Sequence, residues 1–202
     1  FSTVRDILER GPWAGEAFRL LTLRTHYRQP VDFTLEGLDE AKAELDDAYA
    51  MLARAEAPLE NAGATWAEMA AWASEPLLDD LNTPLALSRL RDLRTLENVA
   101  SVGGSARPVL RRIGRDWPVL PGLAAAAFRE AAGLLGLWSS DPEAWLRGGA
   151  GDDAERIEAA IAARAAARKA RDFAGADRIR DELAAEGVVL EDGPQGTVWR
   201  RA

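Results

Sequence analysis

Apolar residues recur at intervals of three and four along the first 147 residues, the spacing that places them on one side of an α-helix. The stretch from Leu38 to Leu52 forms one such stripe, and Pro58 must end its helix. Thr65 and Glu68 have the spacing of a capping box, which predicts a helix start at Thr65. The first part of the chain is therefore predicted to be helical.

Two more helices are predicted from their start signals and their apolar spacing. Asn82 and Pro84 are typical of an N-cap followed by a proline in the first turn. The residues expected to face inward from this helix are Leu87, Leu90 and Leu93. Another apolar stripe covers 123–138 and includes Leu134, and a short helix is expected after Asp141.

The regular pattern weakens twice. Residues 101–121 are rich in Gly, Pro and Arg, which predicts an irregular crossing with one short helix around Leu110. Three glycines within 148–151 predict a flexible joint. After this joint the pattern predicts a small module that begins with helices over 154–171 and 174–186.

The module is predicted to end in a β-hairpin. Gly187 stands where a left-handed helix C-cap is expected, and strands over 188–191 and 197–200 flank turn residues around Gly193. Two helices and a hairpin bury little surface, so we expect this module to be marginally stable or to lean on the helices before it.

Charge placement adds a functional hypothesis, because the formal net charge is −8 and yet arginines gather in one place. On the first helix of the module, Arg164, Arg168 and Arg171 are spaced to share one face. Arginine neutralises phosphate and offers it a planar fork of donors, so a phosphate backbone is the favoured partner. The structural alternative is a solvated face that forms ion pairs with Asp177 and Asp181.

Composition excludes several classes of site. The chain has 202 residues, 48% of them hydrophobic, which is enough for one or two packed cores. It has no cysteine and only His26, which excludes disulfides, thiolate nucleophiles and most zinc sites. No apolar run approaches the roughly 20 residues that span a bilayer, so a cytoplasmic protein without a membrane partner is expected. The first residue is Phe1, which suggests a fragment or a processed product.

The remaining candidate sites have plainer interpretations. Residues 103–105 resemble a phosphate-binding loop only weakly, because the Gly-Lys ending is lacking. Asp79 and Asp80 are acids of the kind that bind metals, but a role at the start of the following helix is favoured. His26 is expected to be structural, and Arg28 either meets a phosphate or forms a surface ion pair. No catalytic residue and no metal ligand is predicted in this chain.

Side chains of the terminal module suit single-stranded RNA. They combine cationic donors, a flat aromatic face and carboxylate acceptors: Arg168, Phe173, Asp177, Arg180 and Asp192. Such RNA is recognised by stacking, by hydrogen bonds to base edges and by phosphate contacts. Carboxylates repel a generic backbone, so this mixture favours specificity over bulk affinity.

The terminal module resembles the carboxyl-terminal part of bacterial cysteinyl-tRNA synthetases. The family's ending has an Arg-rich helix followed by a series of short motifs. In this chain they read Arg171-Asp172-Phe173, Ala176-Asp177, Arg180-Asp181, Leu190-Glu191-Asp192 and Gly196-Thr197-Val198-Trp199-Arg200-Arg201. Upstream stretches are similar as well: residues 1–8 resemble the segment after the KMSKS signature, 25–32 the Ser-His-Tyr-Arg segment, and 79–84 the Asp-Leu-Asn-Thr-Pro helix start.

The resemblance implies a mainly α fold with three parts. These are a stem-contact remnant over 1–20, a DALR-type helical bundle over 21–147, and an α+β anticodon-recognition module of two helices and a β-hairpin over 148–202. It implies that the catalytic domain, with its ATP site and its zinc ion, is absent from this chain, which is then expected to be inactive alone. The implied partners are the tRNA for cysteine and the missing N-terminal domain in cis, in a monomeric parent enzyme.

The resemblance also assigns residues. The anticodon readers are expected to be Arg168, Asp177 and Asp192, with Phe173 as the stacking aromatic. Contacts with the tRNA backbone are expected from Arg164, Arg171, Arg180 and Arg28. Two other hypotheses stay open: a helical protein-interaction domain that binds no RNA, and a related ligase that joins cysteine to an amino sugar. The terminal module disfavours the second, since that ligase is expected to lack it.

Overall fold

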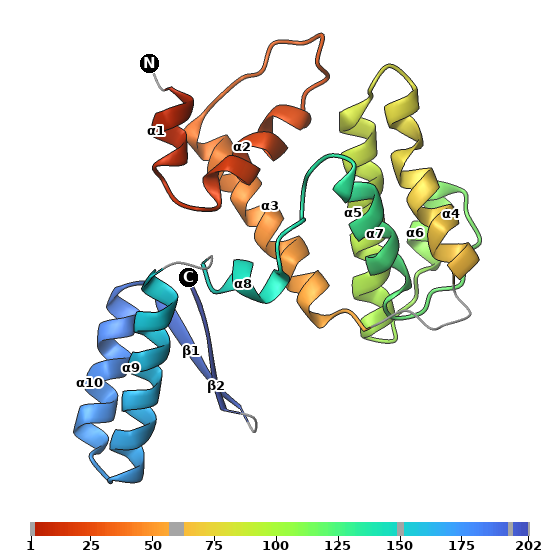
Figure 1. Ribbon diagram of the computed structural model, residues 1–202. Helices are drawn as coiled ribbons and strands as arrows, with labels where there is room; N and C mark the ends of the chain where they lie inside the picture. Colours follow the sequence, from red (N-terminus) through yellow and green to blue (C-terminus); the bar gives the residue numbers. More distant parts are fainter. Residues whose placement is uncertain (1–2, 57–62, 149–151, 194–195, 202) are drawn as a thin grey trace. The chain divides into compact units, whose positions relative to one another are not determined.

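The computed structural model describes residues 3–56, 63–148, 152–193 and 196–201, and it is mainly helical, as predicted (Figure 1). The chain divides into two compact units, Phe1–Pro142 and Glu143–Ala202. The elements of the first unit are α1 (Val4–Leu8), α2 (Ala14–Leu23), α3 (Leu35–Arg54), α4 (Gly63–Ser74), the 3-10 helix η2 (Glu75–Leu78), α5 (Thr83–Ser101), α6 (Arg107–Ile113) and α7 (Leu123–Gly133).

Helix α3 follows the apolar stripe of its sequence. Thr34 caps it, because its side chain accepts a hydrogen bond from the Gly37 N–H at 2.9 Å. The predicted inward residues are all buried: Leu38, Ala41, Leu45, Ala48, Tyr49 and Leu52. This side of α3 packs against α2, and α3 also contacts α5.

The predicted start is wrong for α4 and confirmed for α5. Helix α4 begins at Gly63, so Thr65 lies inside the helix, and the predicted start at Thr65 is wrong. Asn82 does cap α5, since its Oδ1 accepts from the Leu85 N–H at 3.2 Å. Leu87, Leu90 and Leu93 are buried as predicted.

Helix α7 ends earlier than its apolar stripe suggested. Its last residue is Gly133, and Leu134, which the stripe placed inside, is 67% exposed. The start of α7 is held by Glu97 of α5, a buried carboxylate that accepts from the N–H groups of Gly122 at 2.8 Å and Ala125 at 3.1 Å. This carboxylate lies at the positive end of the helix dipole and ties α5 to α7.

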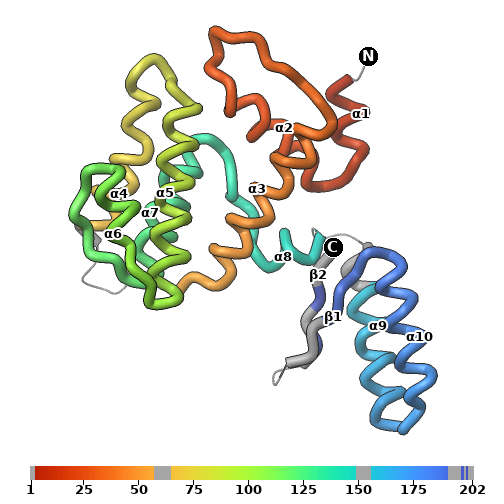
Figure 2. The backbone as a smooth tube through the Cα atoms, turned by 180° about the vertical axis from the view of Figure 1, so that it is seen from behind, coloured from red at the N-terminus to blue at the C-terminus, as the bar shows by residue number. Residues whose placement is uncertain are grey.

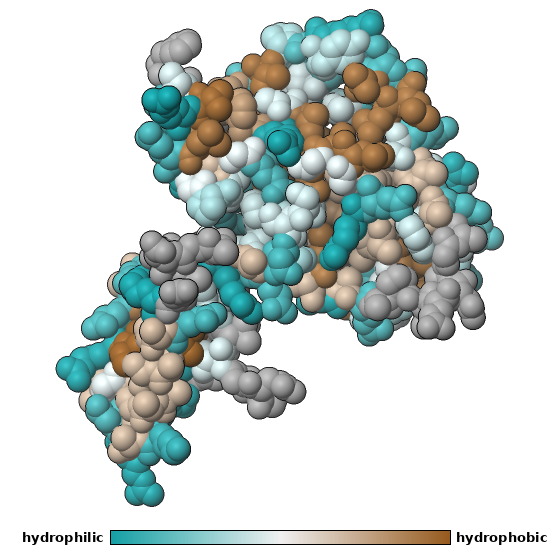
Figure 3. All heavy atoms as spheres, in the orientation of Figure 1, coloured by the Kyte–Doolittle hydropathy of each residue, from teal (hydrophilic) through white to brown (hydrophobic). Residues whose placement is uncertain are grey.

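Hydrophobic surface remains on the first unit. Figure 3 shows it over α1 and over the turn that connects α4 with α5. The largest exposures at that turn and after α5 belong to Leu78 at 90% and Val102 at 81%. In the described part of the chain, no helix combines the length and the apolar character needed to cross a membrane.

The second unit contains the short helix α8 (Pro142–Leu146), α9 (Asp152–Lys169), α10 (Phe173–Ala185), and the strands β1 (Val188–Gly193) and β2 (Gly196–Arg201). The strands pair antiparallel, with Leu190 opposite Trp199. Gly187 has a φ of +76°, which confirms the left-handed turn after α10.

A small core fastens the hairpin to the two helices. It consists of Ile157, Leu183, Val188 and Trp199, each no more than 5% exposed. Because α9 and α10 run in opposite directions and β1 returns along α10, the α9–α10 turn and the end of β1 lie at the same end of the unit (Figure 1).

Candidate nucleic-acid interface

The turn between α9 and α10 has the hydrogen bonds of a Schellman motif. The Asp172 N–H donates to the carbonyl of Ala167 at 2.9 Å, and the Arg171 N–H donates to that of Arg168 at 3.1 Å. The residue in the left-handed position is Arg171, with a φ of +63°. Glycine is usual there, so an arginine is held in a strained conformation at the tip of the turn.

Asp172 fixes the start of α10. Its Oδ1 accepts a hydrogen bond from the Gly175 N–H at 2.9 Å. A Cβ atom on Gly175 would lie 2.3 Å from the other carboxylate oxygen, so this close cap requires glycine. The sequence carries the signal for the cap, an Asp directly before an apolar helix, but our interpretation of the terminal module did not use it.

Phe173 is the first residue of α10, and its side chain is 64% exposed. Asp177 and Arg180 follow it at intervals of four and three, so the three residues lie on one face of the helix. The Asp177 carboxylate is 3.5 Å from Nη1 of Arg180, and both side chains are more than half exposed. This face of α10 thus presents a ring, an acid and a cation to solvent.

The predicted row of three arginines on the first helix is wrong. Arg164 is only 8% exposed, so it belongs to the interior of the unit. Arg171 lies beyond the last residue of α9, because the left-handed turn has already changed the direction of the chain. Only Arg168 is an exposed arginine in the last turn of the helix.

Two arginines outside the predicted row form ion pairs on α10 and between the two helices. The carboxylates of Asp177 and Asp181 both pair with Arg180 of their own helix, the latter at 3.3 Å. One α9 residue that pairs with α10 is Arg156, whose Nη1 lies 3.2 Å from Oε1 of Glu186. That pair holds the two helices together at the end away from the α9–α10 turn.

The structure gathers most of the predicted reader residues at one end of the second unit. Arg168 and Phe173 flank the α9–α10 turn, and Asp177 is one helical turn further along α10. Asp192 lies opposite Thr197 in the hairpin, toward the same end. The side chain of Asp192 is outside the described residues, so its direction is not part of this geometry.

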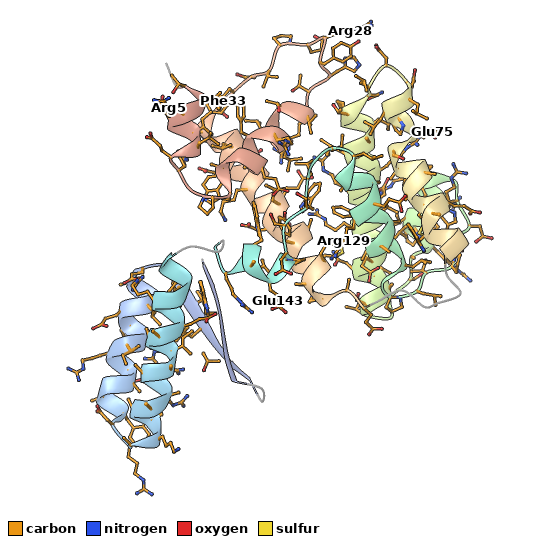
Figure 4. The ribbon with its side chains drawn as sticks, in the orientation of Figure 1. Arg5, Arg28, Phe33, Glu75, Arg129 and Glu143 are labelled. Carbon is orange, nitrogen blue, oxygen red and sulfur yellow. The ribbon has the colours of Figure 1, made fainter. Side chains whose placement is uncertain are left out.

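In the first unit, Arg28 belongs to a polar cluster (Figure 4). Its Nη2 lies 3.1 Å from Asp80 Oδ1, which also accepts from the Tyr27 hydroxyl at 2.7 Å; that hydrogen bond raises the pKa of Tyr27. His26 stacks on Tyr27 with a centroid separation of 4.8 Å. His26 is therefore packed as expected, and Arg28 forms the surface ion pair.

The same cluster corrects the prediction for Asp79 and Asp80. Asn82 caps α5, while Asp80 holds the segment that contains Arg28. Asp80 has a φ of +54° and Leu81 a φ of +50°, so the backbone here is strained. The described residues contain no group of three or more acids or histidines able to hold a metal ion.

Comparisons with known proteins give the site its family. Residues 151–200 match the family model described as the cysteinyl-tRNA ligase anticodon binding domain. The whole chain is similar to the cysteine–tRNA ligases of Rhodospirillum rubrum, 45% identical over 206 residues, and Paramagnetospirillum magneticum, 47% identical over 215 residues. In both cases all of this chain is covered.

The match extends over only part of these relatives. The chain spans about 40% of the length of each. The ligase of Rhodospirillum centenum gives the same picture, with 47% identity over 206 residues. The family model, which covers α9, α10 and most of the hairpin, is that of the anticodon-binding domain. The chain therefore belongs to the cysteine–tRNA ligase family and corresponds to the carboxyl-terminal part of its members.

Proposed function

We propose that this chain binds the tRNA for cysteine and recognises its anticodon through the end of the second unit that carries the α9–α10 turn. The observation that supports this most is the match of residues 151–200 to an anticodon-binding domain, in which the structure leaves Phe173 exposed beside Arg168 and Asp177. At 64% exposure the Phe173 ring is open to a partner.

Each side chain has a distinct task in this proposal. Phe173 stacks on an unpaired base, a contact that tolerates any base. Asp177 and Asp192 accept hydrogen bonds from base edges and supply the specificity. Arg168 reads the anticodon beside them. Arg171 and Arg180 contact phosphates nearby, and Arg28 of the first unit does so by exchanging its ion pair with Asp80 for a phosphate. Arg164 is withdrawn from this role because it is buried.

The activity of the whole protein extends beyond this chain. The relatives are cysteine–tRNA ligases more than twice as long. We propose that the region they have in addition attaches cysteine with ATP and holds a zinc ion, and that this chain alone does not activate cysteine. The first unit then serves as the DALR-type bundle, with residues 1–20 contacting the acceptor stem.

The first test replaces the exposed ring. Phe173→Ala removes the stacking surface and should weaken binding of the tRNA for cysteine by about 1–3 kcal/mol, which is roughly 5- to 150-fold in Kd. Fluorescence anisotropy with labelled tRNA measures this on the 202-residue chain. The same tRNA with its three anticodon bases replaced should bind the unaltered chain more weakly.

Leu134→Ala is the matched control, since Leu134 is a large apolar residue of similar exposure that lies in the first unit. It should leave the Kd unchanged. Equal affinity of the unaltered chain for both tRNAs would contradict anticodon recognition. Absence of salt-dependent tRNA binding would instead favour the helical protein-interaction domain.

A further inference from the structure

Helix α6 and the residues after it form a basic surface that the proposed function does not use. Four arginines occur within nine residues and all four are exposed: Arg107, Arg111, Arg112 and Arg115. Helix α6 contains no acidic residue. We call these four residues the α6 arginine surface; α6 lies on the outer side of the first unit (Figure 2).

Only part of this charge is neutralised. Arg112 pairs with Asp92 of α5. Arg107 and Arg111 form no ion pair or hydrogen bond with any side chain in the part of the chain that the structure describes. On a chain with a net charge of −8 and many surface acids, two adjacent unpaired guanidinium groups are a local exception.

The stability of α6 does not require this arrangement. Cations in the last turn, such as Arg111, interact well with the helix dipole. Arg107 is the first residue of the helix, where the same dipole opposes a cation. Arg107 and Arg111 are also four residues apart, so their like charges repel each other. An anionic partner would offset both costs.

Aromatic rings border the arginines. The guanidinium carbon of Arg115 is 5.7 Å from the centroid of the Trp117 ring, which is half-buried. Trp117 packs edge-on against Trp72. The guanidinium carbon of Arg89 lies 5.0 Å from the centroid of the Trp72 ring. Of the four arginines, Arg115 is therefore the one that lies against an aromatic ring. The planar fork of an arginine can bind two oxygens of a phosphodiester, and tRNA is the polyanion that the chain is expected to hold.

We propose that the α6 arginine surface binds the phosphate backbone of RNA, as a contact separate from the anticodon module. This inference rests on the proposed function, because tRNA is the RNA that the chain is expected to hold. The surface makes no base contacts, so it adds affinity and salt dependence without adding specificity.

The test is the double variant Arg107→Ala and Arg111→Ala in the full chain, with tRNA affinity measured by anisotropy across a series of salt concentrations. Each phosphate contact contributes about 0.9 to the magnitude of the negative slope of log K against log salt. The loss of two contacts should therefore make this slope shallower by about 1 to 2. Affinity should fall at low salt, while the ratio of Kd values between native and anticodon-replaced tRNA stays unchanged.

The matched control is Arg54→Ala with Arg129→Ala, two exposed arginines of the same unit that lie on α3 and α7 (Figure 4 labels Arg129). It removes the same charge from other surfaces and should change the slope less. Thermal melting of both variants checks that the fold is intact.

The outcomes separate the two proposals. If the Arg107 and Arg111 variant has the same slope of log K against log salt as the Arg54 and Arg129 variant, the α6 proposal is overturned. Anticodon recognition is not affected by that result. A lowered slope in a chain that shows no preference between the two tRNAs supports the α6 surface and contradicts anticodon recognition. Poly-glutamate serves as a second ligand that imitates an acidic protein. If the double variant lost binding to poly-glutamate and bound tRNA like the unaltered chain, the surface would belong to an acidic protein partner, and the proposal would be overturned.

Discussion

At the scale of single residues, Arg171 shows a conflict between stability and function. A left-handed conformation costs an ordinary residue about 1–2 kcal/mol, and glycine avoids that cost. Arg171 nonetheless occupies the left-handed position of the α9–α10 turn, two residues before Phe173. Strain of this kind persists where the side chain has a use, and phosphate binding is the use that we propose.

Arg171→Gly should therefore raise the free energy of unfolding of the second unit by about 0.5–1 kcal/mol, the strain relieved less the added entropy of the unfolded chain. The same change should weaken tRNA binding several-fold, since a guanidinium is lost. Urea unfolding and anisotropy measure the two effects. Arg171→Lys, which keeps the charge and the strain, should change each less, and binding that is unaffected in Arg171→Gly would contradict the phosphate role.

Two partly buried carboxylates of the first unit have pKa values that are shifted in opposite directions. Burial raises the pKa of Glu16, against the opposing hydrogen bonds from the Trp138 N–H and the Tyr49 hydroxyl. Burial acts on Glu44 too, but hydrogen bonds from Arg91 at 2.7 Å and Arg24 at 2.7 Å outweigh it and lower the pKa of Glu44. Both have the same ordinary value, 4.5.

The sign of each shift gives a pH prediction. The stabilisation from Glu16 is complete below its ordinary pKa of 4.5 and is lost as the pH rises through the higher pKa of the folded state. The stabilisation from Glu44 is complete above 4.5 and is lost as the pH falls through its lowered pKa. The free energies of unfolding of Glu16→Gln and Glu44→Gln are measured between pH 3 and 7, and each is subtracted from that of the unaltered chain. The two differences should therefore change with pH in opposite directions. Parallel slopes would show that one of the two environments is misassigned.

At the scale of elements, the start of α10 depends on a missing side chain. Alanine is normally a better helix residue than glycine by about 1 kcal/mol. At Gly175 the added Cβ would collide with the Asp172 carboxylate that caps the helix. The propensity gain and the loss of the cap therefore oppose each other at this position.

We expect Gly175→Ala to lower the free energy of unfolding by about 1 kcal/mol, because a lost cap costs about 0.5–2 kcal/mol and the displaced carboxylate adds strain. Gly133→Ala is the control: it also lies within a helix, and nothing lies within 4 Å of its added Cβ. That variant should gain stability by about 0.5–1 kcal/mol. Thermal unfolding of the two variants compares them, and stabilisation in both would show that the cap is dispensable.

Helices were predicted correctly where a capping residue or an apolar spacing within a short stretch of sequence decides them. The Asn82 cap and the inward side of α3 follow from spacing alone, and α6 appears around Leu110 as expected. Residue Leu134 was misplaced because the apolar stripe continues past the point where α7 ends. Periodicity describes which residues are apolar, whereas the end of a helix depends on where its neighbours stop covering it.

At the scale of the whole molecule, two units carry different kinds of contact. The second unit presents Arg168, Phe173 and Asp177 around one turn, and the first presents the α6 arginine surface. In our proposals the second unit recognises bases and nearby phosphates, and the first unit adds a separate contact with the phosphate backbone. The net charge of −8 gives no hint of this division, since it sums over both.

The amino-acid sequence by itself determined the mainly helical class, the hairpin strands of the second unit and the family, because caps, periodicity and short motifs act over a few neighbouring residues. The three-dimensional arrangement alone decided which cations reach solvent. Arg164 and Arg171 have the spacing of one helical face, yet one is buried and the other lies beyond the helix end. Exposure depends on what packs against a residue from distant parts of the chain, and no local pattern records that.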